Sequence, residues 1–399
     1  MRPLYTGTMR EGPLQVLSAF SGMGGMDLGL EAAGFVSRGC FEWNLDAQRS
    51  IAANRGNAWQ IHGHGDISED GVGLTPRNLG LRKGELDLLA GGPPCQPFSK
   101  AAQWSSSSRS GPSDPRHRHI ESFFEIARKF APKFILIENV QGYIQGPTSA
   151  LLELEEYTRE LAQRTRRPYQ LQSRIVDAAD YGVPQHRKRA IVVISTSNSF
   201  VWPKKSRVQR SSWDAIGKPP KLHITESASG RWAGLLNTIP EGQNYQWHTD
   251  RGGGSPLFGY RTRYWSFLQK LHRLAPSPTL AASPGPSTGP FHWDSRPLSI
   301  WEMLRLQTFP GHWTVCGDRR EQVRQVGNAT PPLLAERIGR QIAIALNRTP
   351  SRRLCYSISK QIDPVSVIEV EQQIPSKYLK YLGVHTPHPG VGLGPSPRS

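Results

Sequence analysis

The sequence predicts a doubly wound α/β fold: a mostly parallel sheet with helices on both faces, and a smaller irregular domain inserted near the carboxyl end. Apolar runs of strand length alternate with helical segments from residue 14 to about residue 195, a pattern typical of a parallel sheet flanked by helices. The first run leads into a glycine-rich turn that opens a helix. After residue 195 the periodicity gives way to Gly, Pro, Ser and aromatic residues, which indicates a loop-rich region.

The strands and helices of the first domain follow from these runs. Helices are expected over residues 120–130 and 150–161, because apolar side chains recur there at helical spacing. Helical periodicity returns at residues 297–306 and 333–346. Strands are expected at residues 15–19, 36–42, 86–90, 134–138 and 190–194.

The return of helical periodicity near the end of the chain divides it into four parts. A first domain covers residues 14–195, and a smaller domain covers residues 196–295. Residues 296–347 then complete the small domain and return to the first. We expect the tail, residues 348–399, to bury little and to fray, since it ends in a Gly- and Pro-rich stretch.

Composition and charge restrict the class of protein. The 399 residues include 37% hydrophobic residues, and no apolar run approaches the ~18 needed to span a bilayer. Four scattered cysteines form no CxxC pair, so neither a zinc site nor a disulfide framework is indicated. No secretory signal opens the chain, and we expect a cytoplasmic protein associated with the nucleoid.

The net charge of +17 argues for a polyanionic partner. Between residues 201 and 275, twelve Lys or Arg stand against four Asp or Glu, interleaved with Trp and Tyr. Basic residues mixed with aromatic ones, without amphipathic periodicity, favour a nucleic acid over a membrane.

The amino-terminal strands end in residues suited to a nucleoside. The glycine turn at residues 20–25 opens a helix whose amides favour an anionic group. Glu42 follows about 20 residues later, where a carboxylate accepts from ribose hydroxyls, and Asp66 is a further acid. Phe20 or Trp43 offers a stacking surface. A plainer interpretation of the glycine turn is that it only allows close packing, and a plainer interpretation of Asp66 is that it caps a helix.

Cys95 stands in a stiff turn directly after a predicted strand. Glycines 91 and 92 allow the backbone to turn, and prolines on both sides of the cysteine restrict it. Such a turn presents a thiol as a nucleophile, although a lone cysteine is more often a small buried residue. Glu138 ends the fourth strand and so lies at the same sheet edge, where open α/β sheets bind ligands.

Gln185, Arg187 and Arg189 alternate along the chain and share one face of an extended strand. Their donors can bind an acidic or carbonyl-bearing group, although an alternating basic strand is usually a solvated face.

In order and spacing, these motifs resemble those of the DNA (cytosine-5) methyltransferases over about residues 14–345. The matching segments are Phe20-Ser21-Gly22-Met23-Gly24-Gly25, Phe41-Glu42-Trp43, Gly65-Asp66-Ile67, Gly91-Gly92-Pro93-Pro94-Cys95-Gln96-Pro97-Phe98-Ser99, Glu138-Asn139-Val140, Gln185-His186-Arg187-Lys188-Arg189, Arg296-Pro297-Leu298-Ser299, Arg305-Leu306-Gln307 and Gln325-Val326-Gly327-Asn328.

The resemblance implies the fold of S-adenosylmethionine-dependent methyltransferases and a set of catalytic roles. Cys95 would attack carbon 6 of a cytosine flipped out of the DNA stack. Glu138 would serve ring nitrogen 3, and Arg187 the cytosine carbonyl. Residues 14–195 would then form the catalytic and cofactor-binding domain and residues 196–295 the target-recognition domain. S-adenosylmethionine would be the cofactor, bound by Phe20, Gly22, Gly24, Glu42, Trp43, Asp66 and Asn328.

The implied substrate is a specific sequence in double-stranded DNA, methylated by a monomer that acts beside a separate restriction endonuclease. Residues 100–111 would form a mobile lid after the nucleophile. A tRNA cytosine-5 methyltransferase and a non-catalytic DNA-binding relative are the alternatives. The expected DNA contacts are Ser99, Gln185, Arg189, Arg231, Arg251, Arg261, Arg263 and Thr279.

Overall fold

The computed structural model divides the chain into two compact units, each interrupted in sequence. Unit 1 comprises Met1–Ile175, Arg189–Pro203 and Ala335–Leu354, and unit 2 comprises Val176–Lys188, Lys204–Leu334 and Cys355–Ser399. The residues that the structure describes are 12–94, 115–146, 149–218, 220, 226–261, 264–361 and 373–385. The functional boundaries expected from the sequence, 14–195, 196–295 and 296–347, stay a prediction.

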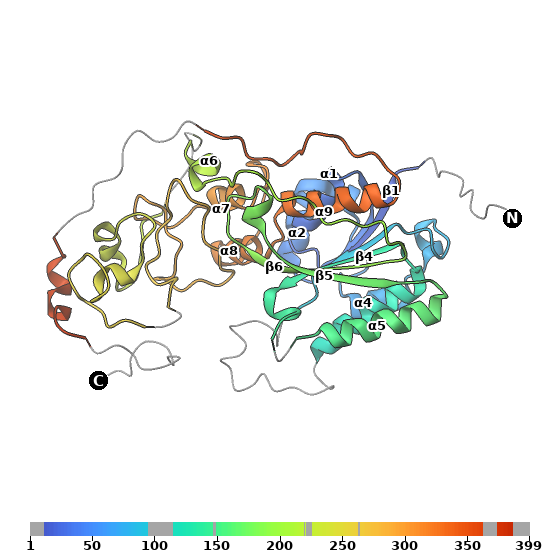
Figure 1. The fold of residues 1–399 in the computed structure, drawn as a ribbon, viewed down its shortest axis with the longest axis horizontal. Coiled ribbons are helices and arrows are strands. Elements are labelled where there is room, and N and C mark those ends of the chain that lie inside the picture. The colour runs from blue at the N-terminus through green and yellow to red at the C-terminus, as the bar shows by residue number, and fades with distance from the viewer. Residues whose placement is uncertain are drawn as a thin grey trace. The chain divides into compact units, whose positions relative to one another are not determined.

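Unit 1 is built on a six-stranded sheet with the order β2-β1-β3-β4-β6-β5 (Figure 1). The first four strands along the chain pair in parallel, and β6 runs antiparallel to β4. The sheet is therefore mostly parallel, as predicted. The strands are β1 Leu14–Ala19, β2 Phe35–Phe41, β3 Leu88–Gly91, β4 Phe134–Val140, β5 Gln170–Asp177 and β6 Lys188–Ser195.

All five predicted strands are present, and β5 was missed. Its sequence, Gln-Leu-Gln-Ser-Arg-Ile-Val-Asp, is largely polar, and most of its side chains are only half-buried. A strand at the edge of a sheet lacks the continuous apolar run that marks a central strand.

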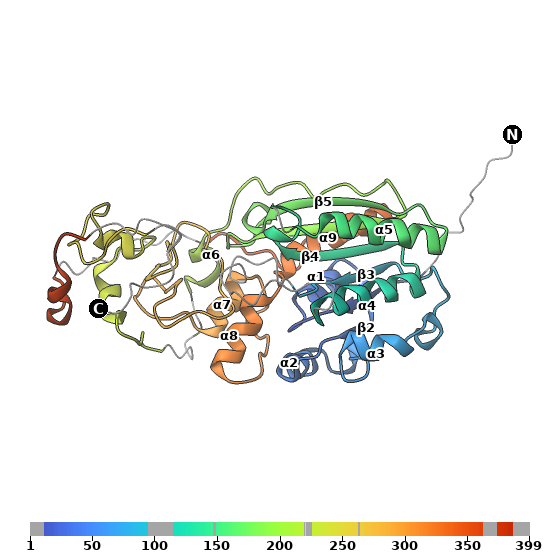
Figure 2. The same cartoon turned by 90° about the horizontal axis from the view of Figure 1, so that it is seen from below.

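Helices cover both faces of the sheet. α3 and α5 both pack against α4 on one face, while α9 packs against α1 on the other (Figures 1 and 2). In the second contact, a Cβ added at Gly339 of α9 would lie 2.9 Å from Leu30 of α1 and from Ala33, the residue that follows α1. The helices are α1 Gly25–Ala32, α2 Leu45–Arg55, α3 Ile67–Gly73, α4 Pro115–Phe130, α5 Leu151–Thr165 and α9 Pro332–Ala345.

Unit 2 is irregular, as its composition predicted. Its α-helices are the short α6 Ser212–Ile216, α7 Ile300–Leu306 and α8 Arg319–Asn328. Ser299 caps α7 in a capping box with Glu302, a fully buried carboxylate that receives two hydrogen bonds from Arg296. One apolar core of the unit consists of Leu235, Leu236, Ile239, Tyr245, Leu257, Leu268, Phe291 and Tyr378.

Tyr378 in that core corrects the expectation for the tail. Residues Ser376–Tyr381 form the 3-10 helix η8, and Tyr378 is only 2% exposed. The expectation that residues 348–399 bury little is wrong at this point, because one aromatic ring supplies apolar area that the Gly- and Pro-rich end lacks. Among the described residues, no helix is long and apolar enough to span a membrane.

Candidate active site

Cys95, the predicted nucleophile, lies outside the described residues, and so do Ser99, Arg263 and the expected lid at residues 100–111. The structure does describe the segment that leads to the cysteine. A Cβ added at Gly91, the last residue of β3, would lie 2.9 Å from the Phe123 ring and 3.0 Å from the Ala19 carbonyl oxygen. Only glycine, which has no Cβ, allows the end of β3 to lie this close to Phe123 and Ala19.

Glu138 lies beside this segment. It is buried near the carboxyl end of β4, and a Cβ added at Gly92 would be 3.7 Å from its Oε2. The next residue, Asn139, donates from Nδ2 to the Pro93 carbonyl oxygen at 3.0 Å. This amide ties the end of β4 to the segment before Cys95, a role that no local pattern in the sequence indicates.

Arg189 pairs with Glu138 in unit 1. Arg189 Nε lies 3.0 Å from Glu138 Oε1. Arg187 is 1% exposed, and its Nη2 donates to the Gly327 carbonyl oxygen at 2.9 Å within unit 2. The antiparallel register of β4 and β6 pairs Val140 with Arg189 and so brings Arg189 to the Glu138 carboxylate.

Gln185 and Thr279 each hydrogen-bond to a backbone group of the chain, while the buried Gln185 Nε2 has no partner among the described residues. Gln185 is fully buried, and its Oε1 accepts from the Leu280 backbone N–H at 3.4 Å. Thr279 Oγ1 donates to the His186 carbonyl oxygen at 2.6 Å. With the bonds of the Ser277 backbone to Pro184 and His186, they join residues 184–186 to residues 277–280 within unit 2.

Glu42 organises the predicted nucleoside site. Its Oε2 accepts from the Gly22 backbone N–H at 2.7 Å, and its Oε1 accepts from the Asn44 N–H at 2.8 Å. Gln48 donates to the carbonyl oxygens of Glu42, at 2.6 Å, and of His64, at 2.7 Å. The glycine turn, the end of β2 and the loop before α3 are therefore linked.

The glycine turn needs its glycines. Gly24 precedes α1 with φ +88°, and a Cβ there would lie 2.5 Å from the Trp59 ring. Gly22 has φ +56°, and no described atom lies within 4 Å of a Cβ added there. The turn therefore borders open space at Gly22, next to the buried carboxylate of Glu42 and the amino end of α1.

Asp66 caps α3, so the plainer interpretation of this residue is confirmed. Its Oδ1 accepts from the Ser68 N–H at 2.8 Å and from Ser68 Oγ at 2.7 Å. Burial acts to raise the pKa of Asp66, but the Ser68 bonds and the positive potential of His119 and Arg118 outweigh it and hold the pKa below its usual value. The group is a carboxylate at neutral pH, as an acceptor in a nucleoside site requires.

The structure thus places six of the seven cofactor candidates in unit 1, at the glycine turn, the end of β2 and the start of α3: Phe20, Gly22, Gly24, Glu42, Trp43 and Asp66. Phe20 packs its ring 6.1 Å from His119, which also contributes to the potential at Asp66. Trp43 follows Glu42 with a side chain 70% exposed, open to stacking. Asn328 is an exposed residue at the end of α8 in unit 2.

In unit 2, described arginines of the expected recognition region lie over aromatic rings. Arg251 lies 3.6 Å from the centroid of Tyr260, Arg231 lies 4.9 Å from that of Trp232, and Arg261 lies 5.9 Å from that of Tyr264. Such stacking orders a guanidinium group while it stays charged.

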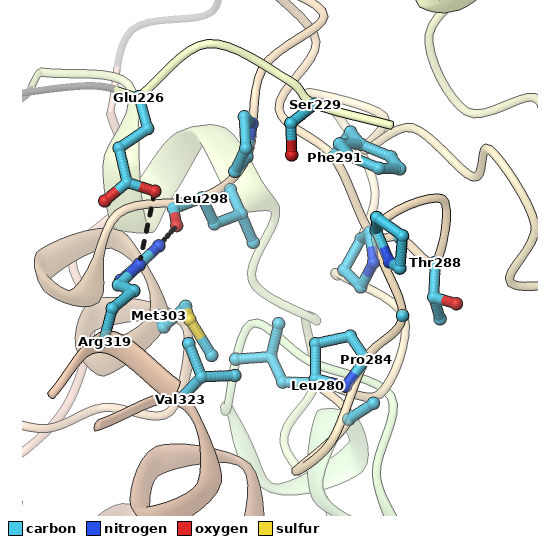
Figure 3. A pocket seen from close by; sticks show the side chains of 16 residues that line it. Glu226, Ser229, Leu280, Pro284, Thr288, Phe291, Leu298, Met303, Arg319 and Val323 are labelled. Atoms are coloured by element: carbon cyan, nitrogen blue, oxygen red, sulfur yellow. Dashed lines mark hydrogen bonds and ion pairs between the residues drawn. The ribbon is translucent and has the colours of Figure 1, made fainter. Parts of the chain in front are cut away.

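Unit 2 also contains a cavity of about 180 Å³ (Figure 3). Its walls are mainly apolar, with Leu280, Phe291 and Met303 among them. At one wall Arg319 points toward Glu226, 3.6 Å away, and donates to the Leu298 carbonyl oxygen. None of the predicted catalytic or cofactor residues lines this cavity, so we do not assign the chemistry to it.

The fold is shared with solved methyltransferases. A candidate DNA modification methyltransferase encoded within an E. coli prophage superposes with a TM-score of 0.58 at 22% identity, covering 84% of this chain and 100% of that chain. The methyltransferase EhMeth of Entamoeba histolytica superposes with a TM-score of 0.55 at 16% identity, covering 84% and 99%. These likenesses define the class of fold, an α/β methyltransferase.

The sequence comparisons define the family. The model of the C-5 cytosine-specific DNA methylases matches residues 14–343. The Type II methyltransferase M.SacI of Streptomyces achromogenes is 32% identical over 378 residues, covering 85% of this chain and 95% of that protein. M.Eco47II of Escherichia coli is 30% identical over 363 residues, covering 84% and 80%. The chain therefore belongs to the C-5 cytosine-specific DNA methylases and is a DNA (cytosine-5-)-methyltransferase, which favours the main prediction over the tRNA and non-catalytic alternatives.

Proposed function

We propose that this enzyme methylates carbon 5 of a cytosine flipped out of a specific double-stranded DNA sequence, with Cys95 as nucleophile and S-adenosylmethionine as cofactor. The observation that carries the proposal is the position of Glu138, buried beside the Gly92-Pro93 segment that leads directly to Cys95. An acid and a thiol at one sheet edge are the pair of groups that addition to a cytosine ring requires.

In this mechanism Cys95 adds through its thiolate to carbon 6, and the ring electrons shift toward carbon 5. Glu138 assists by donating a proton or a strong hydrogen bond at nitrogen 3, and Arg189 holds the carboxyl group in place from 3.0 Å. S-adenosylmethionine, when bound, would supply an electrophilic methyl group for carbon 5, with its sulfur leaving as the neutral thioether of S-adenosylhomocysteine. After carbon 5 loses its proton to a base, the sulfur of Cys95 leaves carbon 6 and the ring regains its aromatic electrons.

The cofactor residues suit an adenosine joined to an amino acid. A carboxylate offers about four acceptor positions, so ribose hydroxyls can donate to Glu42 beside the two backbone groups that orient it. The open space at Gly22, next to the amino end of α1, suits the methionine portion. Phe20 or Trp43 would stack on the adenine, and Asp66 would accept from its amine. Asn328 would close the site from α8.

The recognition of a specific DNA sequence would fall to the basic and aromatic residues of unit 2, among them Arg231, Arg251 and Arg261. Relatives named Type II methyltransferases support a role beside a separate restriction endonuclease of the same specificity. We expect the enzyme to act as a monomer.

Bisulfite sequencing of DNA from cells that express the chain tests this function. The wild-type protein should protect cytosines within one short sequence motif, and Cys95→Ser should abolish the protection because it removes the nucleophile. Cys355→Ser is the matched control, since Cys355 is an exposed cysteine in unit 2. Protection that persists in Cys95→Ser would overturn the assignment of the nucleophile, and unprotected DNA with the wild-type protein would overturn the proposed substrate.

A further inference from the structure

The tail segment η8, Ser376–Tyr381, is an integral part of unit 2. The Tyr378 ring is buried in the core with Leu235 and Leu236, and it stacks on Trp232 at a centroid distance of 5.7 Å. In Figures 1 and 2 the dark red helix lies beside the yellow-green segments that contain these core residues. The contact therefore joins η8 to a part of the core that lies more than 130 residues earlier in the chain.

Two hydrogen bonds fix this position. The Tyr378 hydroxyl donates to the Arg231 carbonyl oxygen at 3.0 Å and accepts from the Gly234 backbone N–H at 3.1 Å. The hydroxyl of this buried tyrosine is both donor and acceptor. Displacing the side chain is costly, because it would leave the Arg231 carbonyl oxygen and the Gly234 N–H without this partner. Gly383 adds a backbone bond to the Pro256 carbonyl oxygen at 3.3 Å.

The docked segment brings three exposed cations together. Arg231 lies between two rings, 4.9 Å from the centroid of Trp232 and 5.2 Å from that of Tyr381, and it donates to the Tyr381 hydroxyl. Lys377 lies 4.9 Å from the centroid of Tyr378, and Lys380 lies 5.3 Å from that of Tyr381. All three cationic side chains belong to exposed residues.

The same two stretches of chain carry no acidic residue. Residues 227–237 and 373–385 contain no Asp or Glu, so no carboxylate within them neutralises the three cations. Cations ordered by aromatic rings pay less entropy when they bind an anion. A regular polyanion, one phosphate after another, matches such a cluster better than a single small anion does.

We propose that η8 forms part of the DNA-binding surface of unit 2, with Lys377, Lys380 and Arg231 contacting backbone phosphates of the duplex. The proposal rests on the proposed function for the identity of the polyanion. Phosphate contacts position a protein on DNA without reading its sequence, so the segment contributes affinity and orientation rather than sequence preference.

The salt dependence of DNA binding tests the proposal with the full chain. The dissociation constant of a duplex that contains the methylated motif is measured from 50 to 300 mM KCl for the wild type and for Lys377→Ala/Lys380→Ala. Each phosphate contact contributes about 0.9 to the slope of log K against log salt, so the slope should fall by about 1.8. A duplex of unrelated sequence should show the same fall, and Lys377→Glu/Lys380→Glu should weaken binding further.

The control is Arg77→Ala/Lys83→Ala, which removes two exposed cations that precede β3 in unit 1. Its slope should match that of the wild type. A slope unchanged in Lys377→Ala/Lys380→Ala, with thermal unfolding also unchanged, overturns the proposal. Methylation by the wild-type protein in the same samples separates the two questions: without it the proposed function fails, while a changed slope still supports the surface.

Discussion

Glu42 shows how one buried side chain shapes a site. Its carboxylate accepts from backbone groups on both sides, at Gly22 and at Asn44, and so it fixes the glycine turn against the end of β2. The residue type was predictable from its place at the end of a strand. Its part in shaping the turn was not, because that depends on which backbone N–H groups approach it.

Gly22→Ala should weaken the binding of S-adenosylmethionine roughly tenfold or more, a loss of about 1.4 kcal/mol. The added methyl group would enter the open space beside Glu42 that we assign to the cofactor. Gly80→Ala is the matched control, since Gly80 also has a left-handed φ, +66°, and no described atom within 4 Å of its Cβ position.

Both variants should lose about 1 to 2 kcal/mol of stability from the strained backbone, but only Gly22→Ala should lose affinity. Isothermal titration calorimetry and thermal unfolding measure the two effects. Equal affinities in the two variants would refute the placement of the cofactor.

The pairing of β4 with β6 brings Glu138 and Arg189 together at the edge of the sheet. Its antiparallel register pairs Glu138 with Ile191 and Val140 with Arg189. The sequence predicted both strands and the alternation of the arginines. The family resemblance implied a role for Arg187 at the cytosine carbonyl, and that role stays a prediction. The ion pair of Arg189 with Glu138 could not be predicted, because alternation gives the shared face of a strand but not its register with a neighbour.

Glu138→Gln should lower kcat about 10²- to 10⁴-fold, the usual contribution of a general acid or base. The amide keeps the shape of the side chain and can donate a hydrogen bond, but it cannot transfer a proton. Affinity for S-adenosylmethionine should stay unchanged. Incorporation of labelled methyl groups under saturating conditions measures the rate, with Glu155→Gln on the exposed face of α5 as control. A normal kcat in Glu138→Gln would exclude its catalytic role.

At the scale of the whole molecule, the loops of unit 2 are joined by hydrogen bonds from side chains, where unit 1 has a regular sheet. Lys270 is 4% exposed, and its Nζ donates to the carbonyl oxygens of Leu236, at 3.2 Å, and Ile239, at 3.0 Å, and to Ser295 Oγ at 3.0 Å. Composition predicted that this region is irregular. It did not predict which cation joins the loops, since such contacts lack a local pattern, and it missed the docking of Tyr378 for the same reason.

Because of Lys270, the free energy of unfolding of unit 2 should increase as the pH rises above about 8. Burial lowers the pKa of its ammonium group to about 8, although Asp294 and Glu241 act in the opposite direction. Between pH 8 and the unfolded value near 10.5 the unfolded chain binds more protons, so the free energy of unfolding should rise with pH by up to about 1.4 kcal/mol per pH unit.

Urea titrations from pH 7 to 10 measure this effect, with Lys270→Gln for comparison. The rise should be smaller in the variant, which has no titrating group at this position. Identical pH dependence in the two proteins would show that Lys270 keeps an ordinary ammonium group.

The packing of α9 on α1 has a consequence for synthesis on the ribosome. All six strands are translated by residue 195, yet the helix whose Gly339 fits against Leu30 and Ala33 follows only after residue 331. In the nascent chain all six strands are therefore present while more than 130 further residues are translated. During that time α9 does not yet cover its part of one apolar face of the sheet. Translation that stops early leaves that face exposed, so an interrupted copy is a ready substrate for chaperones and proteases.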